Sequence, residues 1–418
     1  MQRVGWKWCG IARRLPPSLD RWRRNLWALW SAQMLAMIAM SAVIPFLPLF
    51  IRQLGVASEV EERQWSGLVF AAPFFTSLIA SPIWGALADR YSRKAMVLRA
   101  VVGISIALIL MGLSRSVQEL FFWRLVQGGI SGFIAAALGF VAAETPPTHR
   151  GYAIGVLQTS QSVGAVVGPF LGGLISHYAG MRSVFWVMSA LCALSAVVVL
   201  LAVEETSTPD RSRKQTLQLR DNLRAAWTIP GFALALGCIV LAQMGTVMPS
   251  PQMPFFLEEL GVGEQQLQLV TGIVVGVTGL STLVAAPFIG KEVDRRGART
   301  IVRWSAAVAT VSLLVQAIAG SVWVVLAARV ILGIALSGLV PALNTFVSMR
   351  IPEGRQSGMM SLASSAMLLG NLVAPPIGGL LSAHAGIRVV FGVASLCTAS
   401  ILVVLWWVPR RNANRRAV

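Results

Sequence analysis

Acidic residues and cysteines are scarce in this sequence, and their scarcity excludes several kinds of site. Only 17 of the 418 residues are Asp or Glu, and none of them falls in the middle of a long apolar run. The four cysteines, Cys9, Cys192, Cys238 and Cys397, have no spacing typical of a metal site or a disulfide framework. We therefore expect no metal, no cofactor and no disulfide.

Charged residues of any kind are few, at 12%, whereas 56% of the chain is hydrophobic and the mean hydropathy is positive. This composition excludes an ordinary soluble protein and indicates a polytopic membrane protein. A net charge of +18 could suggest nucleic-acid binding. However, the cations lie in short segments between apolar runs, as the positive-inside rule describes, so we expect a lipid bilayer and no nucleic acid as partner.

Twelve runs are long enough to cross a bilayer, which takes roughly 20 apolar residues. An even number places both termini on one side. The predicted inner segments carry most of the Lys and Arg, so we expect both termini to be cytoplasmic in a bacterial inner membrane. The predicted spans are residues 26–50, 66–88, 95–114, 119–142, 152–176, 182–203, 230–257, 267–289, 300–319, 322–347, 357–382 and 388–408.

Polar segments divide the chain. The only long polar interruption separates two groups of six spans, and both ends of the chain are basic. The predicted organisation is a basic N-terminal tail, a six-helix bundle, a cytoplasmic linker, a second six-helix bundle and a basic C-terminal tail, at residues 1–25, 26–203, 204–229, 230–408 and 409–418.

The two groups of spans are copies of one design. The charged turn GALADRYSRK at 85–94 returns as GKEVDRRGAR at 290–299, which is 205 positions later (85 to 290). The string PFLPLF at 45–50 returns as PQMPFF at 251–256, which is 206 positions later (45 to 251). So steady an offset indicates duplication, with a binding site between the halves near the bilayer midplane.

The turn at 85–94 resembles the signature loop of the major facilitator superfamily, except that Ser92 stands where the family usually has glycine. Glycine allows an unstrained positive φ, so Ser92 could alter the turn. The resemblance implies an all-α membrane fold of twelve helices in two pseudo-symmetric halves, and a cytoplasmic latch between them. Ordinary solvated loop charge is the alternative interpretation. The predicted latch residues are Asp89, Arg90, Arg93, Lys94, Asp294 and Arg295.

Arg124 lies inside an apolar span, where a guanidinium needs a partner in the bundle interior. Its surroundings match the family's R-x-x-Q-G motif, whose arginine is linked to proton coupling. The alternative is an arginine bonded to backbone carbonyls where spans 4 and 5 meet. Because no carboxylate lies mid-span, Glu144 and Glu119 are the other candidates for proton coupling.

Span 5 carries small residues at every fourth position, which leaves one helix face nearly bare. Its proline removes a backbone donor and permits a bend. The pattern resembles the motif of the drug:proton antiporter branch, with tight packing as the alternative reason for the glycines. The predicted hinge residues are Gly164, Gly168, Pro169, Gly172 and Gly173.

Flexible thioethers and a few amides at membrane depth suit a cavity for varied apolar ligands, although core or lipid-facing packing explains a methionine equally well. The candidate cavity residues are Met37, Met40, Gln127, Gln158, Gln161, Gln243, Met244, Asn344 and Asn371.

The strings at 45–49 and 65–67 resemble the multidrug exporters of that branch. The resemblance implies a monomeric secondary transporter that exports hydrophobic or amphipathic small molecules by proton antiport and rocker-switch alternating access. A facilitator or importer of a specific metabolite is the alternative. An enzyme is not expected, because the chain has no catalytic constellation and no phosphate-binding glycine loop.

Overall fold

The computed structural model describes residues 17–90, 92–206, 227–351 and 356–407. Within them, twelve helical segments are long and apolar enough to cross a membrane, which confirms the predicted number. The first half comprises α1 (Pro17–Val43), η1 (Ile44–Phe46), α2 (Leu47–Gln53), α3 (Glu59–Arg90), α4 (Arg93–Leu113), α5 (Val117–Ile130), α6 (Phe133–Glu144), η2 (Pro147–His149), α7 (Arg150–Ala179) and α8 (Met181–Ala202). The second comprises α10 (Phe232–Val247), η3 (Ser250–Gln252), α11 (Met253–Glu259), α12 (Glu264–Arg296), α13 (Ala298–Ala317), α14 (Val322–Ser348), α15 (Gln356–Ala385) and α16 (Ile387–Trp407).

The sequence repeat is reproduced residue by residue at one end of the molecule. Residues 44–46 and 250–252 each form a 3-10 turn, and each turn leads into a seven-residue helix, α2 or α11. Both short helices then end at a left-handed glycine, Gly55 or Gly261. Paired prolines cause the common break, because they cannot donate to the preceding turn.

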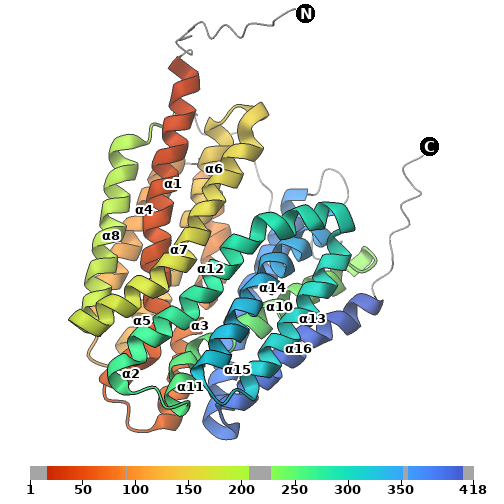
Figure 1. Cartoon of the computed structure of the whole chain (residues 1–418). Coiled ribbons are helices and arrows are strands. Elements are labelled where there is room, and N and C mark those ends of the chain that lie inside the picture. Colours follow the sequence, from red (N-terminus) through yellow and green to blue (C-terminus); the bar gives the residue numbers. More distant parts are fainter. Residues whose placement is uncertain (1–16, 91, 207–226, 352–355, 408–418) are drawn as a thin grey trace, which may run out of the picture.

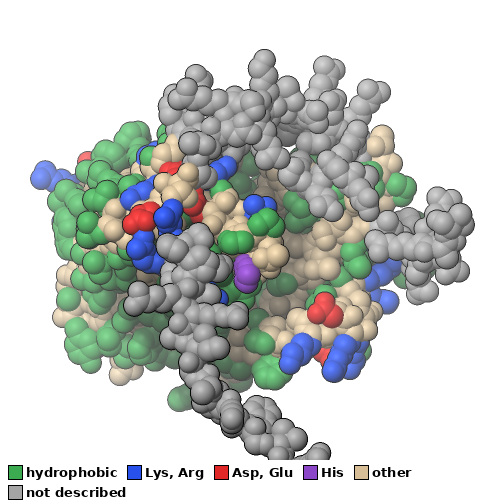
Figure 2. All heavy atoms as spheres, turned by 90° about the horizontal axis from the view of Figure 1, so that it is seen from above, with side chains coloured by type: hydrophobic (Ala, Val, Ile, Leu, Met, Phe, Trp, Pro, Cys, Tyr) green, Lys and Arg blue, Asp and Glu red, His purple; other side chains and the backbone are tan. Residues whose placement is uncertain are grey.

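The two halves touch mainly through two helix pairs, α3 with α15 and α7 with α12. They meet at the end that carries α2 and α11, at the bottom of Figure 1, which we call the closed end. At the other end, where α7 begins and α12 ends, the halves diverge (Figure 1). Viewed from that open end, the surface is hollowed between the halves (Figure 2).

The first helix is longer than predicted. α1 begins at Pro17, inside the segment 1–25 that we expected to be a tail. Proline is favoured in the first turn of a helix, where its missing N–H has no partner to lose. Trp22 is buried against His149, and the side-chain amide of Asn25 exchanges hydrogen bonds with the backbone of Glu204. The beginning of α1 therefore packs into the first bundle.

The predicted span 119–142 is not one helix. It breaks between α5 and α6, where Gly132 has φ +117°. Backbone exposed at membrane depth needs hydrogen-bond partners from the protein. Trp84 donates to the Gly129 carbonyl oxygen at 2.7 Å, and Arg99 donates to that of Ser131 at 3.2 Å. The Arg99 guanidinium also stacks on the Trp84 ring, so these two side chains support the break.

Candidate functional site: the interface between the halves

Glycines allow α7 and α12 to cross with their backbones in contact. A methyl group on Gly272 would lie 2.6 Å from the Pro169 carbonyl oxygen, and one on Gly279 would lie 2.8 Å from that of Ala165. Both distances are too short for any side chain. Because Pro169 has no N–H, the Ala165 carbonyl lacks its usual helical partner at this crossing. The halves therefore meet on a bare, bendable part of α7.

The stripe of small residues at every fourth position of α7 faces a helix of its own half. Gly164, Gly168 and Gly172 pack against α1, within the first half. The residues that meet α12 are displaced by one position, at 165, 169 and 173. Tight packing thus accounts for the stripe itself, and the face beside it joins the halves.

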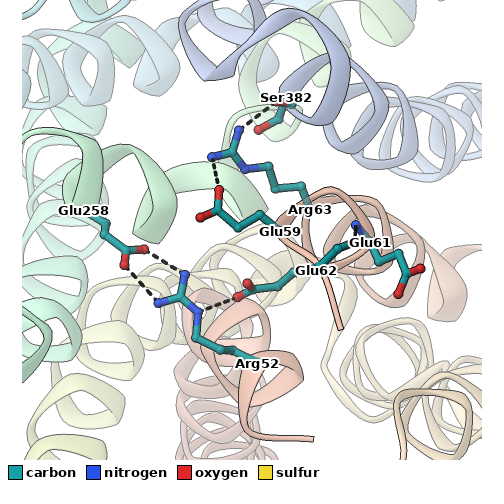
Figure 3. Close-up of polar contacts among 8 residues, drawn as sticks. Arg52, Glu59, Glu61, Glu62, Arg63, Glu258 and Ser382 are labelled. Atoms are coloured by element: carbon teal, nitrogen blue, oxygen red, sulfur yellow. Dashed lines mark hydrogen bonds and ion pairs between the residues drawn. The ribbon is translucent and has the colours of Figure 1, made fainter. Parts of the chain in front are cut away.

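A charge cluster ties the halves together at the closed end (Figure 3). Arg52 of α2 donates two hydrogen bonds to Glu258 of α11, at 3.1 and 2.8 Å. Its Nε atom donates to Glu62 of α3 at 2.9 Å. Arg52 and Glu258 are 206 positions apart (52 to 258), which is the repeat offset. They occupy equivalent positions in the two halves and carry opposite charges.

Further contacts between α3 and α15 surround this cluster. Arg63 donates to the Ser382 carbonyl oxygen at 2.9 Å, and the Gln64 amide lies 3.1 Å from the His384 ring nitrogen. A pocket of about 260 Å³ opens beside Arg52, lined by Arg52, Glu59, Glu62, Arg63, Phe255, Glu258 and Glu259. The closed end is therefore a polar, charged junction.

Arg124 of α5 is buried within the first half. Its Nε atom donates to the Val69 carbonyl oxygen on α3 at 3.1 Å, and Nη1 donates to Gln127 Oε1 at 2.7 Å. Pro73, four residues after Val69, cannot donate to that carbonyl, so the arginine takes the place of the missing helical N–H. The carbonyl comes from span 2 and not from the contact between spans 4 and 5.

The repeat counterpart, Arg329 of α14, is equally buried but poorly bonded. Its Nη2 atom lies 4.0 Å from the Met253 sulfur, and its Nε atom has no hydrogen-bond partner among the described residues. Thr278 stands where the first half has Pro73, and its hydroxyl bonds the Val274 carbonyl at 3.3 Å. The carbonyl that would match Val69 is therefore already satisfied.

The two charged turns differ at the position that departs from the family pattern. Ser92, with φ −68°, caps α4 by accepting from the Ala95 N–H, whereas Gly297 has φ +82°. Glu205 bonds the Ser92 hydroxyl and accepts from the Arg93 and Lys94 N–H groups. A carboxylate at a helix N-terminus is favourable, so Glu205 holds this turn to its own half.

The remaining latch residues are dispersed. Lys94 Nζ donates to the carbonyl oxygens of Leu200 and Val203 at 2.9 and 2.6 Å. Asp294 is exposed, and Arg295 pairs with Glu292 at 3.6 Å. The side chains of Asp89 and Arg90 lie outside the described residues. The latch stays a prediction.

Neither acidic candidate for proton coupling lies beside Arg124. Glu119 is exposed, and its carboxylate accepts from the Arg115 N–H at 2.9 Å at the start of α5. Glu144 accepts from the Thr206 N–H and hydroxyl at 2.9 and 2.7 Å at the end of α6. Glu62 and Glu258 received no role from the sequence, because both lie near the ends of spans. The repeat offset between Arg52 and Glu258 was the signal that could have paired them.

The candidate cavity residues have different environments. Gln127 accepts a hydrogen bond from Arg124, and Gln243 is buried with its Cβ beside Gly370. Gln158 is exposed and lies two turns before Ala165 on the same face of α7, in the first part of that helix. The other six candidates are half-buried, namely Met37, Met40, Gln161, Met244, Asn344 and Asn371. Asn371 Oδ1 has no hydrogen-bond partner among the described residues.

Within the described part of the chain, no group of three or more His, Cys, Asp or Glu side chains is placed to hold a metal ion.

Two repeated six-helix bundles, meeting on glycine-lined helix crossings, define a two-half membrane transporter. The family model of the Major Facilitator Superfamily matches the chain twice, over residues 29–240 and 235–418, and the chain belongs to that superfamily. It is 34% identical to the multidrug resistance protein MdtG of Serratia proteamaculans over 400 residues, covering 96% of this chain and 97% of that protein. It is 32% identical to MdtG of Escherichia fergusonii, covering 94% and 96%.

Solved structures show the same fold at low sequence identity. A D-xylose–proton symporter superposes with a TM-score of 0.74 at 14% identity, covering 94% of this chain and 98% of that one. A bacterial homologue of the human lysosomal transporter Spinster superposes with a TM-score of 0.73 at 19% identity, covering 94% and 97%. These similarities support the fold and say nothing of the cargo.

Proposed function

We propose that this protein exports hydrophobic or amphipathic small molecules from a bacterial cell in exchange for protons. The observation that carries the proposal is its similarity, along nearly the whole chain, to proteins named for multidrug resistance. The apolar spans without a central carboxylate support it, because such a path offers few groups to select one polar solute.

The proposed mechanism is alternating access between the two halves. With the basic segments placed in the cytoplasm, the open end faces inward and the closed end faces outward. Cargo would enter the hollow between the halves past Gln158. The halves would then rock on the crossings of α7 with α12 and of α3 with α15, closing inside and opening outside. The latch at Arg93 and Lys94 would act at the cytoplasmic end.

The experiment that tests this proposal uses a panel of hydrophobic and amphipathic drugs. Expression in an efflux-deficient bacterium is expected to lower drug accumulation and raise resistance. In proteoliposomes that carry a pH-sensitive dye, addition of a transported drug is expected to move protons. A protein that changes neither accumulation nor resistance, and moves no protons with any drug, would remove the proposal. Proton-independent exchange of a polar metabolite would favour a facilitator instead.

A further inference from the structure

The charge cluster at the closed end holds more negative than positive charge. Arg52 is shared by two carboxylates, so the group of Arg52, Glu62 and Glu258 carries one net negative charge when both acids are ionised. Glu62 is the buried member, with 7% of its side chain exposed against 37% for Glu258. It receives one hydrogen bond from Arg52, and Glu258 receives two. One proton would make the group neutral.

We propose that Glu62 is a proton-binding site, and that a proton there stabilises the closed end. Once protonated, Glu62 no longer competes with the Glu258 carboxylate for the charge of Arg52. In the closed arrangement the two carboxylates repel each other across one guanidinium. If the halves separate at this end, Glu258 leaves, and Arg52 and Glu62 form a balanced pair. The closed arrangement therefore binds the proton more tightly, and proton binding in turn favours closure.

The other charged groups at this junction are engaged elsewhere. On α3, Glu59 pairs with Arg63 at 3.5 Å and is 82% exposed. On α11, Glu259 pairs with Arg388 at 2.9 Å. On α15, a ring nitrogen of His384 lies 3.1 Å from the side-chain amide nitrogen of Gln64. The pocket of about 260 Å³ reaches Glu62, which gives a proton a path from the surface.

The inference builds on the proposed function, because a proton arriving from outside would return an exporter to its outward-closed arrangement once the cargo has left. The test of this inference measures distances between spin labels and does not measure transport. The inference and the proposed function can therefore fail separately. Spin labels on Ala57→Cys and Gln265→Cys, both exposed and one on each half, report separation at the closed end. The parent chain also carries His384→Gln, to remove the imidazole that contacts α3, and alanine at Cys9 and Cys397.

Between about pH 8 and about pH 5.5, the ratio of short to long label distances in the purified parent is expected to rise about fivefold, which needs less than one unit of difference in proton affinity between the arrangements. Glu62→Gln mimics the protonated acid and is expected to hold the low-pH ratio at both pH values. Glu62→Asp retains a carboxyl group and is expected to restore the pH response.

Glu59→Gln is the matched control, since it neutralises an exposed acid one turn away on the same helix. It is expected to respond to pH as the parent does. The proposal is wrong if the parent does not respond, if Glu62→Gln responds like the parent or stays at the high-pH ratio, or if Glu59→Gln abolishes the response.

Discussion

The two halves of this transporter share one design but stabilise it differently at the buried arginine. In the first half, Arg124 has two partners, the Val69 carbonyl freed by Pro73 and the Gln127 side chain. In the second half, Arg329 has a sulfur at 4.0 Å and an unbonded Nε atom. Duplication kept the cation and did not keep its partners. Both arginines are buried, but among the described residues only the first is held by hydrogen bonds to oxygen atoms of its own half.

The same contrast holds along the helix that bears each arginine. The first half breaks this span at Gly132 and supports the break with Trp84 and Arg99. The second half continues through the equivalent level as α14. Positions 205 later than Trp84 and Arg99 hold Ile289 and Trp304, so the supporting groups were not duplicated. Whether this helix breaks therefore depends on the side chains that can bond its backbone, and the sequence repeat alone does not decide it.

Replacing each arginine by methionine is expected to give the largest difference in stability between the two halves. Arg124→Met leaves two buried acceptors unbonded and should lower the free energy of unfolding by about 2 kcal/mol. Arg329→Met removes a poorly bonded buried charge and should leave stability unchanged or raise it. Thermal unfolding of the purified proteins compares them. Equal losses in both variants would show that Arg329 has a partner in the working protein.

Giving Val69 back its helical donor tests why Arg124 is held. Pro73→Ala supplies the missing N–H, which would compete with the arginine for one carbonyl. Arg124→Met should then cost about 1 kcal/mol less in the Pro73→Ala background than alone. A double-mutant cycle of unfolding temperatures measures this coupling. Additive effects would mean that the freed carbonyl is not the reason for the contact.

The two charged turns should show a smaller difference. Gly297→Ser forces a side chain into φ +82° and is expected to cost about 1 kcal/mol. Ser92→Gly removes the cap on α4 and the hydroxyl contact with Glu205, and is expected to cost a few tenths of a kcal/mol. The same unfolding assay ranks them. A larger loss for Ser92→Gly would show that its contact with Glu205 matters more than the backbone conformation does.

The sequence predicted the features that follow from hydropathy and repetition. Span number depends on apolar length, and the paired breaks before α2 and α11 follow from the repeated prolines. The break at Gly132 was not predictable, because it depends on Trp84 and Arg99 from other helices. The direction of the α7 stripe was also open, since spacing identifies a bare face without naming its neighbour. The start of α1 at Pro17 had a sequence signal in that proline.

Candidate site residues were harder to place, because roles in a transporter depend on contacts between halves. Arg124 and Gln127 were found from a local motif and do lie together. Glu119 was proposed from its nearness in sequence to Arg124, but five positions along a helix point in different directions. Glu62 was missed because only the folded chain brings it to Arg52.

Whether the closed end must open during transport is the most direct test of alternating access in this protein. Cysteines at Ala57 and Gln265, joined by a cleavable bifunctional reagent, would hold the segment between α2 and α3 to the start of α12. Drug-driven proton movement in proteoliposomes is expected to fall to that of protein-free liposomes and to recover when the reagent is cleaved. Each single-cysteine variant, treated alike, should retain activity. Full transport by the completely cross-linked protein would contradict the account.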